Sequence, residues 1–169
     1  EFIRTVKAIA PTFGGINLED IKAPECFEIE TRLREELDIP LMHDDQHGTA
    51  IISSAALLNG AKIAGKELDK MRVVVNGAGA AAIACARLFV ELGIRRENMV
   101  LCDSHGAVTV YREDINPMKR ELATTRRIST LAEAVQGADI FLGVSKADTL
   151  TPEMLRTMAE NPIVMALAN

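Results

Sequence analysis

Aromatic residues and cysteine are both scarce in this sequence. Among its 169 residues there are five Phe, one Tyr and no Trp, so aromatic side chains amount to only 4% of the chain. The core must therefore be built mainly from Ala, Val, Ile and Leu, as in an ordinary α/β protein with room for one domain or slightly more. The three cysteines are too few and too scattered for a disulfide framework, and they predict reduced thiols in a cytoplasmic protein.

Long apolar runs and clusters of basic residues are also absent. Nothing approaches the length of a membrane-spanning helix and no signal-peptide pattern opens the chain, so we predict no membrane contact. The net charge of −5 and the lack of Lys/Arg runs argue against a nucleic-acid partner. There is no starting Met, residues 1–10 already form an amphipathic helical pattern, and the apolar segment 162–169 stops where a loop should follow. We therefore expect a fragment of a longer chain.

The first part of the chain, residues 1–45, predicts a helix, a short strand, a second helix and another short strand. The second helix should cover roughly residues 24–37 with its charged residues outward. The residues of this helix that we expect to face inward are Phe27, Ile29, Leu33 and Leu37. We interpret this part as the end of an α/β domain.

The second part, residues 46–169, begins with a predicted helix over 49–64 that ends at Gly65, and strands then alternate with helices. The expected strands are 71–75, 98–102, 139–143 and 163–167; the expected helices are 80–92, 131–135 and 152–159; the polar stretch 105–127 has no clear pattern. Such alternation is typical of a parallel sheet with helices on both faces. We predict a doubly wound, Rossmann-like α/β domain preceded by the end of the other domain.

A glycine-rich turn joins the first of these strands to the helix that follows it. The turn consists of Gly77, Ala78, Gly79, Ala80, Ala81 and Ala82, a G-x-G-x-x-A pattern. Gly77 would allow the tight turn, and Gly79 would let a backbone amide approach a pyrophosphate at the helix N-terminus. Asp103 ends the next strand, about 20 residues further on, where a carboxylate meets the cofactor ribose. A merely structural turn is the alternative, but the flanking strand and helix favour a dinucleotide site.

The choice between NAD and NADP stays open from charge alone. Asp103 favours NAD, because a carboxylate repels a 2′-phosphate. Lys119 and Arg120 could fold back over the same site and attract that phosphate, although a solvated helix face explains them equally well.

Two acidic pairs precede the glycine-rich turn, Glu19-Asp20 and Asp44-Asp45, each beside apolar, strand-like residues. Carboxylate oxygens suit Mg²⁺ or Mn²⁺, and burying them would be costly without a cation or strong donors. Adjacent acids on a strand point to opposite faces, so the chain would have to bend, as residues 21–24 indicate. Surface turns and helix caps are the alternative explanation for such pairs.

The same segment also permits a zinc hypothesis. His43 and His47 are spaced i, i+4 with an acid after the first, similar to the H-E-x-x-H helix of zinc proteases. Two features oppose it: Asp44 replaces the Glu base, and the segment up to Gly48 reads as a loop entering the helix at Thr49.

Six segments of the chain stand out together by their order and spacing. They are Phe13–Asp20 (FGGINLED), Pro24–Phe27 (PECF), His43–Ala50 (HDDQHGTA), Asn76–Ala81 (NGAGAA), Gly137–Gly143 (GADIFLG) and Ala166–Asn169 (ALAN). This set resembles the central part of a bacterial malic enzyme of the short type. The resemblance implies oxidative decarboxylation of (S)-malate to pyruvate and CO₂, with reduction of NADP, or of NAD as the alternative, and with Mg²⁺ or Mn²⁺. It also implies a homo-oligomer for the full-length protein.

The resemblance implies a role for particular residues. Glu19, Asp20 and Asp45 correspond to the metal ligands, and Asp44 to an acid that supports the catalytic base. Residues 77–81 correspond to the pyrophosphate turn and Asp103 to the ribose contact, while Asn169 lies near nicotinamide and substrate. On this view residues 1–45 are the C-terminal part of the substrate and metal domain, and residues 46–169 the cofactor domain, truncated at its C-terminal end.

The resemblance leaves gaps. The family's catalytic Lys and Tyr lie N-terminal to this segment, so we expect the segment to be inactive alone. The stretch 106–127 departs from the family pattern, with residues 107–111 (AVTVY) where a glycine-containing turn is usual. A nucleotide-binding module without catalytic activity is therefore the alternative function. The acidic residues favour the enzyme, because a pure binding module has no use for them.

Overall fold

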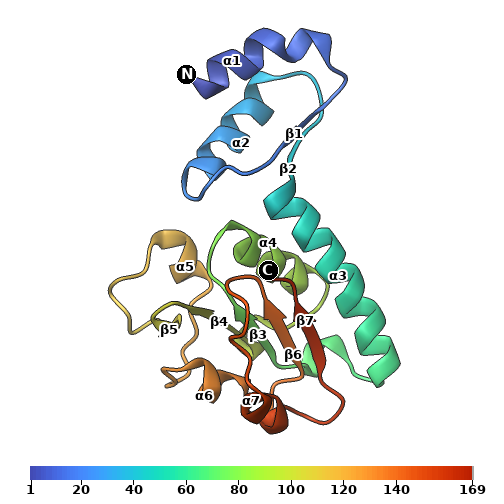
Figure 1. Ribbon diagram of the computed structural model, residues 1–169, viewed down its shortest axis with the longest axis vertical. Helices are drawn as coiled ribbons and strands as arrows, with labels where there is room; N and C mark the ends of the chain where they lie inside the picture. Colours follow the sequence, from blue (N-terminus) through green and yellow to red (C-terminus); the bar gives the residue numbers. More distant parts are fainter. Residues whose placement is uncertain (169) are drawn as a thin grey trace.

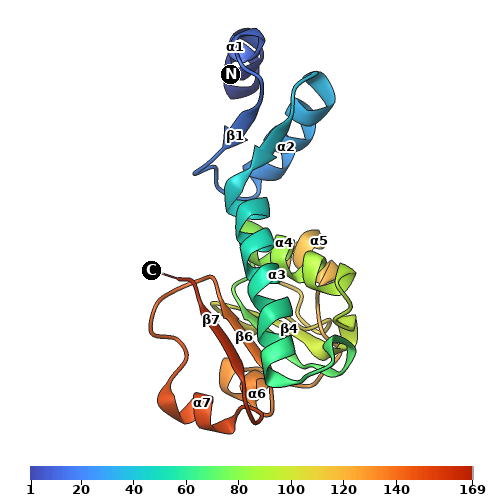
Figure 2. The same ribbon diagram turned by 90° about the vertical axis from the view of Figure 1, so that its right-hand side faces the viewer.

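The computed structural model describes residues 1–168, and a long helix, α3 (Asp44–Ala64), joins its two parts. A small N-terminal unit lies at one end of this helix, and the other end lies along the side of a five-stranded sheet (Figures 1 and 2). The two-part organisation therefore depends on one helix that belongs to both parts.

The N-terminal unit has the predicted order of helix, strand, helix and strand. Its elements are α1 (Phe2–Ile9), the 3₁₀ turn η1 (Ala10–Thr12), β1 (Ile16–Leu18), α2 (Glu25–Glu36) and β2 (Leu41–His43). The two strands pair in parallel, and Val6, Leu18 and Leu33 form the buried centre. The expected inward face of α2 is present: Leu33 is fully buried, Ile29 and Leu37 are partly buried against the same cluster, and Phe27 packs against the core of the second part. The helix also buries Cys26 and Glu30, which were not expected to face inward.

Helix α3 begins earlier than predicted, at Asp44 rather than at Thr49. The predicted loop up to Gly48 is therefore wrong. Two carboxylates in the first turn are favourable beside the free N–H groups of a helix N-terminus. Gly48, which the sequence made look like a helix breaker, instead leaves space for the Asp44 carboxylate, since a Cβ at this position would collide with Asp44 Oδ1. The helix ends as predicted at Gly65, whose φ of 66° is left-handed.

The second part is a twisted sheet with the order β5-β4-β3-β6-β7. Its strands are β3 (Val73–Asn76), β4 (Met99–Asp103), β5 (Gly106–Ala107), β6 (Ile140–Gly143) and β7 (Ile163–Ala166). All neighbours pair in parallel except the short edge strand β5, which is antiparallel to β4. The four strands predicted from sequence are all present within a residue or two of their expected ends.

Helices cover both faces of this sheet, which confirms the predicted doubly wound α/β class. Strand residues of one face, such as Val73 and Leu101, pack with α3 and α4 (Ala80–Glu91). Residues of the opposite face, such as Val74 and Phe141, pack with α6 (Leu131–Val135) and the end of α7 (Pro152–Thr157). Central strands buried on both faces explain why their sequences are continuous apolar runs rather than alternating ones.

The polar stretch without a predicted pattern folds over the edge of the sheet beside β4. It contains β5, an isolated parallel bridge between Thr109 and Thr124, and the short helix α5 (Pro117–Glu121). Val108 is fully buried there, and Ile115 and Leu122 nearly so. Short 3₁₀ turns, η2 (Leu68–Lys70) and η3 (Arg96–Asn98), precede β3 and β4. Within the part of the chain that is described, no helix is long and apolar enough to cross a membrane.

Candidate functional site

The glycine-rich turn lies where the strand order reverses. From β3 the chain continues to β4 on one side, while β6 pairs on the other, and open α/β sheets bind ligands outside the carboxyl ends of such strands. Gly77 has a φ of 146°, and a Cβ there would lie 2.9 Å from Val144 Cγ2. Gly79 caps helix α4, and a Cβ there would meet no protein atom within 4 Å. Gly77 is thus required by the fold, whereas Gly79 keeps open a space that a ligand can fill.

A cleft of about 510 Å³ continues from this turn toward the end of β4. Asn76, Asp103, Thr130, Lys146 and Thr149 are among the residues that line it. Asn76 donates through Nδ2 to Thr149 Oγ1 at 2.7 Å, which fixes the segment after β6 beside the glycine-rich turn. The cleft therefore has the place and the polar lining that the adenosine half of a dinucleotide needs.

Asp103 lies at the edge of this cleft and is paired with two cations. Its carboxylate accepts from Arg112 Nη1 at 2.8 Å and from Lys119 Nζ at 2.7 Å, and it also accepts the backbone N–H of His105 at 2.9 Å. Burial alone would raise the pKa of Asp103, but the bonds from Arg112 and Lys119 lower it to about 2. The carboxylate is therefore ionised, and Arg112 and Lys119 already balance its negative charge without a ligand.

Sequence reasoning missed Arg112, the centre of this cluster. Its guanidinium also donates to Asp114, with Nη2 at 2.6 Å from Oδ2, and the two carboxylates raise the pKa of Arg112. Lys119 does fold back toward Asp103, as the sequence allowed. Arg120 does not; its side chain donates to the Arg112 carbonyl instead. Arg112 stands in the stretch without a pattern, so no local signal could have placed it here.

The structure brings together one residue from each acidic pair. The backbone N–H of Asp20 donates to Asp45 Oδ2 at 2.9 Å. Strand β1 ends at Leu18 and Asp20 has a left-handed φ of 57°, so the chain does bend close to the predicted place. Asp44 instead folds back over Gly48. Within residues 1–168, no three His, Cys, Asp or Glu side chains are close enough together to form a ready metal site.

His43 supplies an independent sign that this region is built for a ligand. The imidazole is fully buried, and neither ring nitrogen has a hydrogen-bond partner in the described part of the chain. Its Nε2 lies 3.8 Å from Asp45 Oδ2. An unpartnered buried polar group is costly, and it is expected where a site is completed on binding. The oxygen-rich donor set beside it fits Mg²⁺ or Mn²⁺.

The zinc hypothesis is not supported by this geometry. His47 Nε2 is engaged with Glu30 Oε1 at 2.7 Å, while His43 is buried beneath Asp45. The two imidazoles therefore do not present free nitrogens to a common point.

A second cleft, of about 380 Å³, connects the acidic region with the glycine-rich turn. Asp45, Thr49 and Ile52 line it from α3, Ala81 lines it from the first turn of α4, and Ser145 follows β6. Ala168 also lines this cleft. The predicted nicotinamide and substrate residue, Asn169, lies outside the described residues.

The strand order, the switch point and the glycine-rich turn together define an NAD(P)-binding domain of the doubly wound class. Comparison with known families agrees with this. Residues 46–169 match the family described as "Malic enzyme, NAD binding domain", and residues 1–34 match "Malic enzyme, N-terminal domain". The chain belongs to the malic enzyme family.

Some relatives of this chain are named as NADP-dependent and others as NAD-dependent. The chain is 54% identical to an NADP-dependent malic enzyme of Halomonas elongata, over 99% of this chain and 40% of that protein. It is also 54% identical to an NAD-dependent malic enzyme of Rhizobium meliloti, over 99% of this chain and 22% of that protein. Among solved structures, the NAD-dependent malic enzyme of Thermotoga maritima matches with a TM-score of 0.90 and 42% identity, over 99% of this chain and 46% of that one. The chain thus spans less than half the length of these relatives.

Proposed function

We propose that this chain is the metal-binding and cofactor-binding core of an enzyme that oxidatively decarboxylates (S)-malate to pyruvate and CO₂ with reduction of NADP. The observation that supports this most directly is the cleft shared by Asp45 and Ala81. Asp45, a proposed ligand of the hard cation, and Ala81, in the proposed pyrophosphate turn, line the walls of one cavity, as hydride transfer from a chelated hydroxy acid would require. Residues 1–45 then form the end of the substrate and metal domain, and residues 46–169 form the cofactor domain.

In this proposal Glu19, Asp20 and Asp45 hold Mg²⁺ or Mn²⁺. Such a cation supplies Lewis-acid polarisation of the substrate's oxygens. The chain contributes two ligand segments that already meet, because the Asp20 N–H is bonded to Asp45 Oδ2 at 2.9 Å. Glu19 directly precedes Asp20 in the chain and is the third proposed ligand. Asp44 acts electrostatically on the catalytic base, which, with the catalytic acid, comes from outside this segment.

The cofactor is proposed to be NADP, with NAD as the alternative. Residues 77–81 hold the pyrophosphate, Asp103 lies at the ribose and Asn169 lies near the nicotinamide. Arg112 and Lys119 add two positive charges at Asp103, whose own charge they already neutralise. Asp114 is a second carboxylate bonded to Arg112, so Arg112 and Lys119 together balance two negative charges. The repulsion expected from Asp103 is therefore offset, and a 2′-phosphate is not excluded.

The test is a reduced-nicotinamide absorbance assay of the protein at its natural length, with malate, Mn²⁺ and either NADP⁺ or NAD⁺. We expect malate-dependent and metal-dependent reduction, faster with NADP⁺, and no signal from residues 1–169 alone. The full-length protein is expected to assemble as a homo-oligomer. A folded, metal-supplied protein that binds NADP⁺ but shows no turnover would contradict the enzyme and favour the binding module without catalysis.

A further inference from the structure

A buried polar cluster joins α2 to the first turn of α3. Glu30, on α2, accepts hydrogen bonds from Gln46 Nε2 at 3.1 Å and from His47 Nε2 at 2.7 Å. The Glu30 side chain is only 9% exposed, and within residues 1–168 its single ion-pair partner is His47. We call these three residues the Glu30 cluster. A carboxylate in such a position is held by the two donors rather than by solvent.

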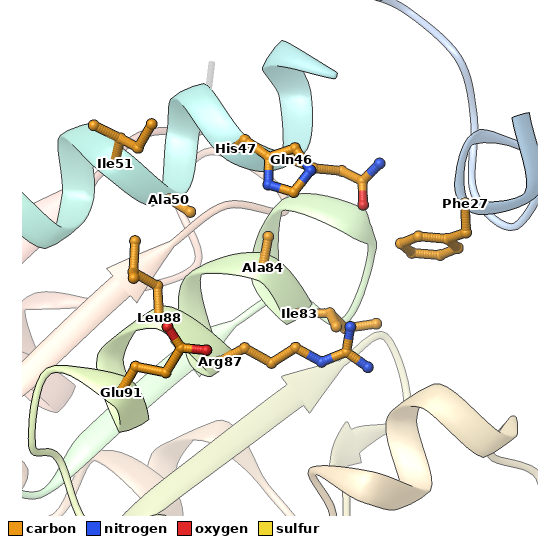
Figure 3. A pocket seen from close by; sticks show the side chains of 10 residues that line it. All are labelled: Phe27, Gln46, His47, Ala50, Ile51, Ile83, Ala84, Arg87, Leu88 and Glu91. Carbon is orange, nitrogen blue, oxygen red and sulfur yellow. The ribbon is translucent and has the colours of Figure 1, made fainter. Parts of the chain in front are cut away.

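An apolar contact on the same helix accompanies the Glu30 cluster. Phe27, one turn before Glu30, packs against the core cluster of the cofactor domain. Figure 3 shows Phe27 facing Gln46 and His47 across a pocket whose floor carries Ile83 and Arg87 of α4. The pocket has a volume of about 280 Å³. Because this space is not filled by side chains, tight packing alone does not fix the angle between α2 and α3.

The cluster lies between the two acidic segments. Asp20 precedes α2 along the chain, and Asp45 is the direct neighbour of Gln46 on α3. Asp20 and Asp45 each lie two residues past the last β1–β2 pair, Leu18 and His43. The ladder therefore fixes the strands, and the orientation of the first turn of α3 sets where the Asp45 carboxylate lies relative to Asp20. Only one hydrogen bond, from the Asp20 N–H to Asp45 Oδ2, joins these two residues directly.

We propose that Glu30 is a positioning residue for the divalent-metal site: through Gln46 and His47 it sets the orientation of the first turn of α3, and thereby the distance of Asp45 from Asp20. This inference rests on the proposed function, because it assumes that Asp20 and Asp45 hold the cation. Glu30 itself does not touch the cation. Supporting partners of this kind control metal affinity by orienting the ligands.

The chemistry of the cluster explains why a carboxylate is used here. The two carboxylate oxygens of Glu30 accept hydrogen bonds in defined directions and so orient the side chains of Gln46 and His47. An apolar side chain at this position would pack against them without fixing their orientation. Replacing Glu30 with leucine would leave the buried Gln46 amide without its acceptor, and it would release His47, whose side chain is 40% exposed, to turn toward water. Replacing it with glutamine keeps the shape and one acceptor, and its amide can donate to the other tautomer of His47.

The experiment measures Mn²⁺ affinity, from the electron paramagnetic resonance signal of free Mn²⁺, in the protein at its natural length. The variants are Glu30→Leu and Glu30→Gln, with Glu28→Leu as the matched control, since the Glu28 side chain is on the same helix but 73% exposed. We expect Glu30→Leu to weaken Mn²⁺ binding by about 10- to 100-fold. Glu30→Gln should retain most of the affinity, Glu28→Leu all of it, and NADP⁺ affinity should be unchanged in each.

The outcomes separate this inference from the proposed function. If the unchanged protein does not bind Mn²⁺, the proposed metal site is wrong. If it does bind and a folded Glu30→Leu protein binds equally well, only the positioning role is overturned. Equal losses for the leucine and glutamine variants would overturn it too, because charge rather than bonding geometry would then be responsible. Should Glu30→Leu fail to fold, Gln46→Met tests the same bond from α3, and an unchanged Mn²⁺ affinity there overturns the proposal.

Discussion

Asp45 Oδ2 accepts the backbone N–H of Asp20 at 2.9 Å, across 25 residues of sequence. This bond joins the segment after β1 to the first turn of α3, and so links the acidic pair Glu19-Asp20 to the acidic pair Asp44-Asp45. Asp20 reaches it with a left-handed φ of 57°, a conformation that Asp adopts more readily than most non-glycine residues. The bend at Asp20 therefore aims its backbone N–H at the Asp45 carboxylate.

Replacing Asp45 with asparagine tests the role of its charge. The amide oxygen can still accept the Asp20 N–H, so the fold should survive, but a neutral ligand binds a hard cation far more weakly. We expect Mn²⁺ affinity to fall by at least the roughly 10- to 100-fold seen for supporting residues, and malate turnover to be lost with it. NADP⁺ affinity should persist. Asp38→Asn, an exposed acid nearby, is the control; loss of NADP⁺ binding together with Mn²⁺ binding would indicate misfolding instead.

Lys119 should decide the cofactor preference. Its Nζ lies 2.7 Å from Asp103 Oδ2, at the place where a 2′-phosphate would be bound. A hydrogen bond to a charged group contributes about 1.5–3 kcal/mol, so Lys119→Met should weaken NADP⁺ binding by roughly 10- to 150-fold while changing NAD⁺ binding little. Titration of both cofactors into the variant measures this. Arg120→Met removes the same charge one residue away and should leave both affinities nearly unchanged; an equal loss in the two variants would contradict a specific role for Lys119.

The sequence predicts the strands and the glycine-rich turn well but does not predict the ionic cluster around Arg112, and the reason is physical. Strand and helix patterns depend on nearby residues, so β3, β4, β6 and β7 were located from apolar runs, and the glycine-rich turn from its flanking elements. Arg112 acquires its place through the fold over β4, where it meets Asp103 and Asp114 at once. No local spacing specifies such a three-residue contact, and the family resemblance did not supply it.

The start of helix α3 was predicted wrongly for a different reason, because a local pattern was present but misleading. The segment up to Gly48 was interpreted as a loop and the helix was expected to start at Thr49, but the helix includes Gly48 and begins at Asp44. The cost of a helical glycine is about 1 kcal/mol relative to alanine, and the structure accepts it to leave space for the Asp44 carboxylate. Local propensity was outweighed here by the space that the Asp44 carboxylate occupies. The Glu30 cluster was missed likewise, because an acid on a helix normally faces solvent.

Because Asp103 is paired with Arg112 and Lys119, the free energy of unfolding should depend on pH in the acid range. Burial raises the pKa of Asp103, but Arg112 and Lys119 lower it from 3.8 to about 2 overall. A carboxyl with a lowered folded-state pKa contributes stability that is complete above its unfolded pKa and is lost as pH falls through the folded one. We expect about 2 kcal/mol of the free energy of unfolding to disappear between roughly pH 5 and pH 2 from this residue.

Denaturant unfolding of the unchanged protein and of Asp103→Asn across that pH range measures this contribution. Other carboxyls also lose stabilising bonds in acid, for example Glu121, whose pKa Arg87 lowers. The difference between the two proteins is therefore the relevant quantity. It should be large near neutral pH and shrink toward zero in acid. A difference that stays constant with pH would show that Asp103 is not linked to folding through its charge.

The two glycines of the cofactor turn should respond in opposite ways to alanine. At Gly77, with a φ of 146°, a Cβ would lie 2.9 Å from Val144 Cγ2, so Gly77→Ala should destabilise the fold by more than about 1 kcal/mol. At Gly79 the backbone is extended and a Cβ would meet nothing within 4 Å, so Gly79→Ala should leave the free energy of unfolding nearly unchanged. The added methyl group would instead occupy the space proposed for the pyrophosphate and weaken NADP⁺ binding. Thermal unfolding and NADP⁺ titration of both variants separate the effects. If Gly79→Ala binds NADP⁺ as tightly as the unchanged protein, the pyrophosphate does not lie at this turn.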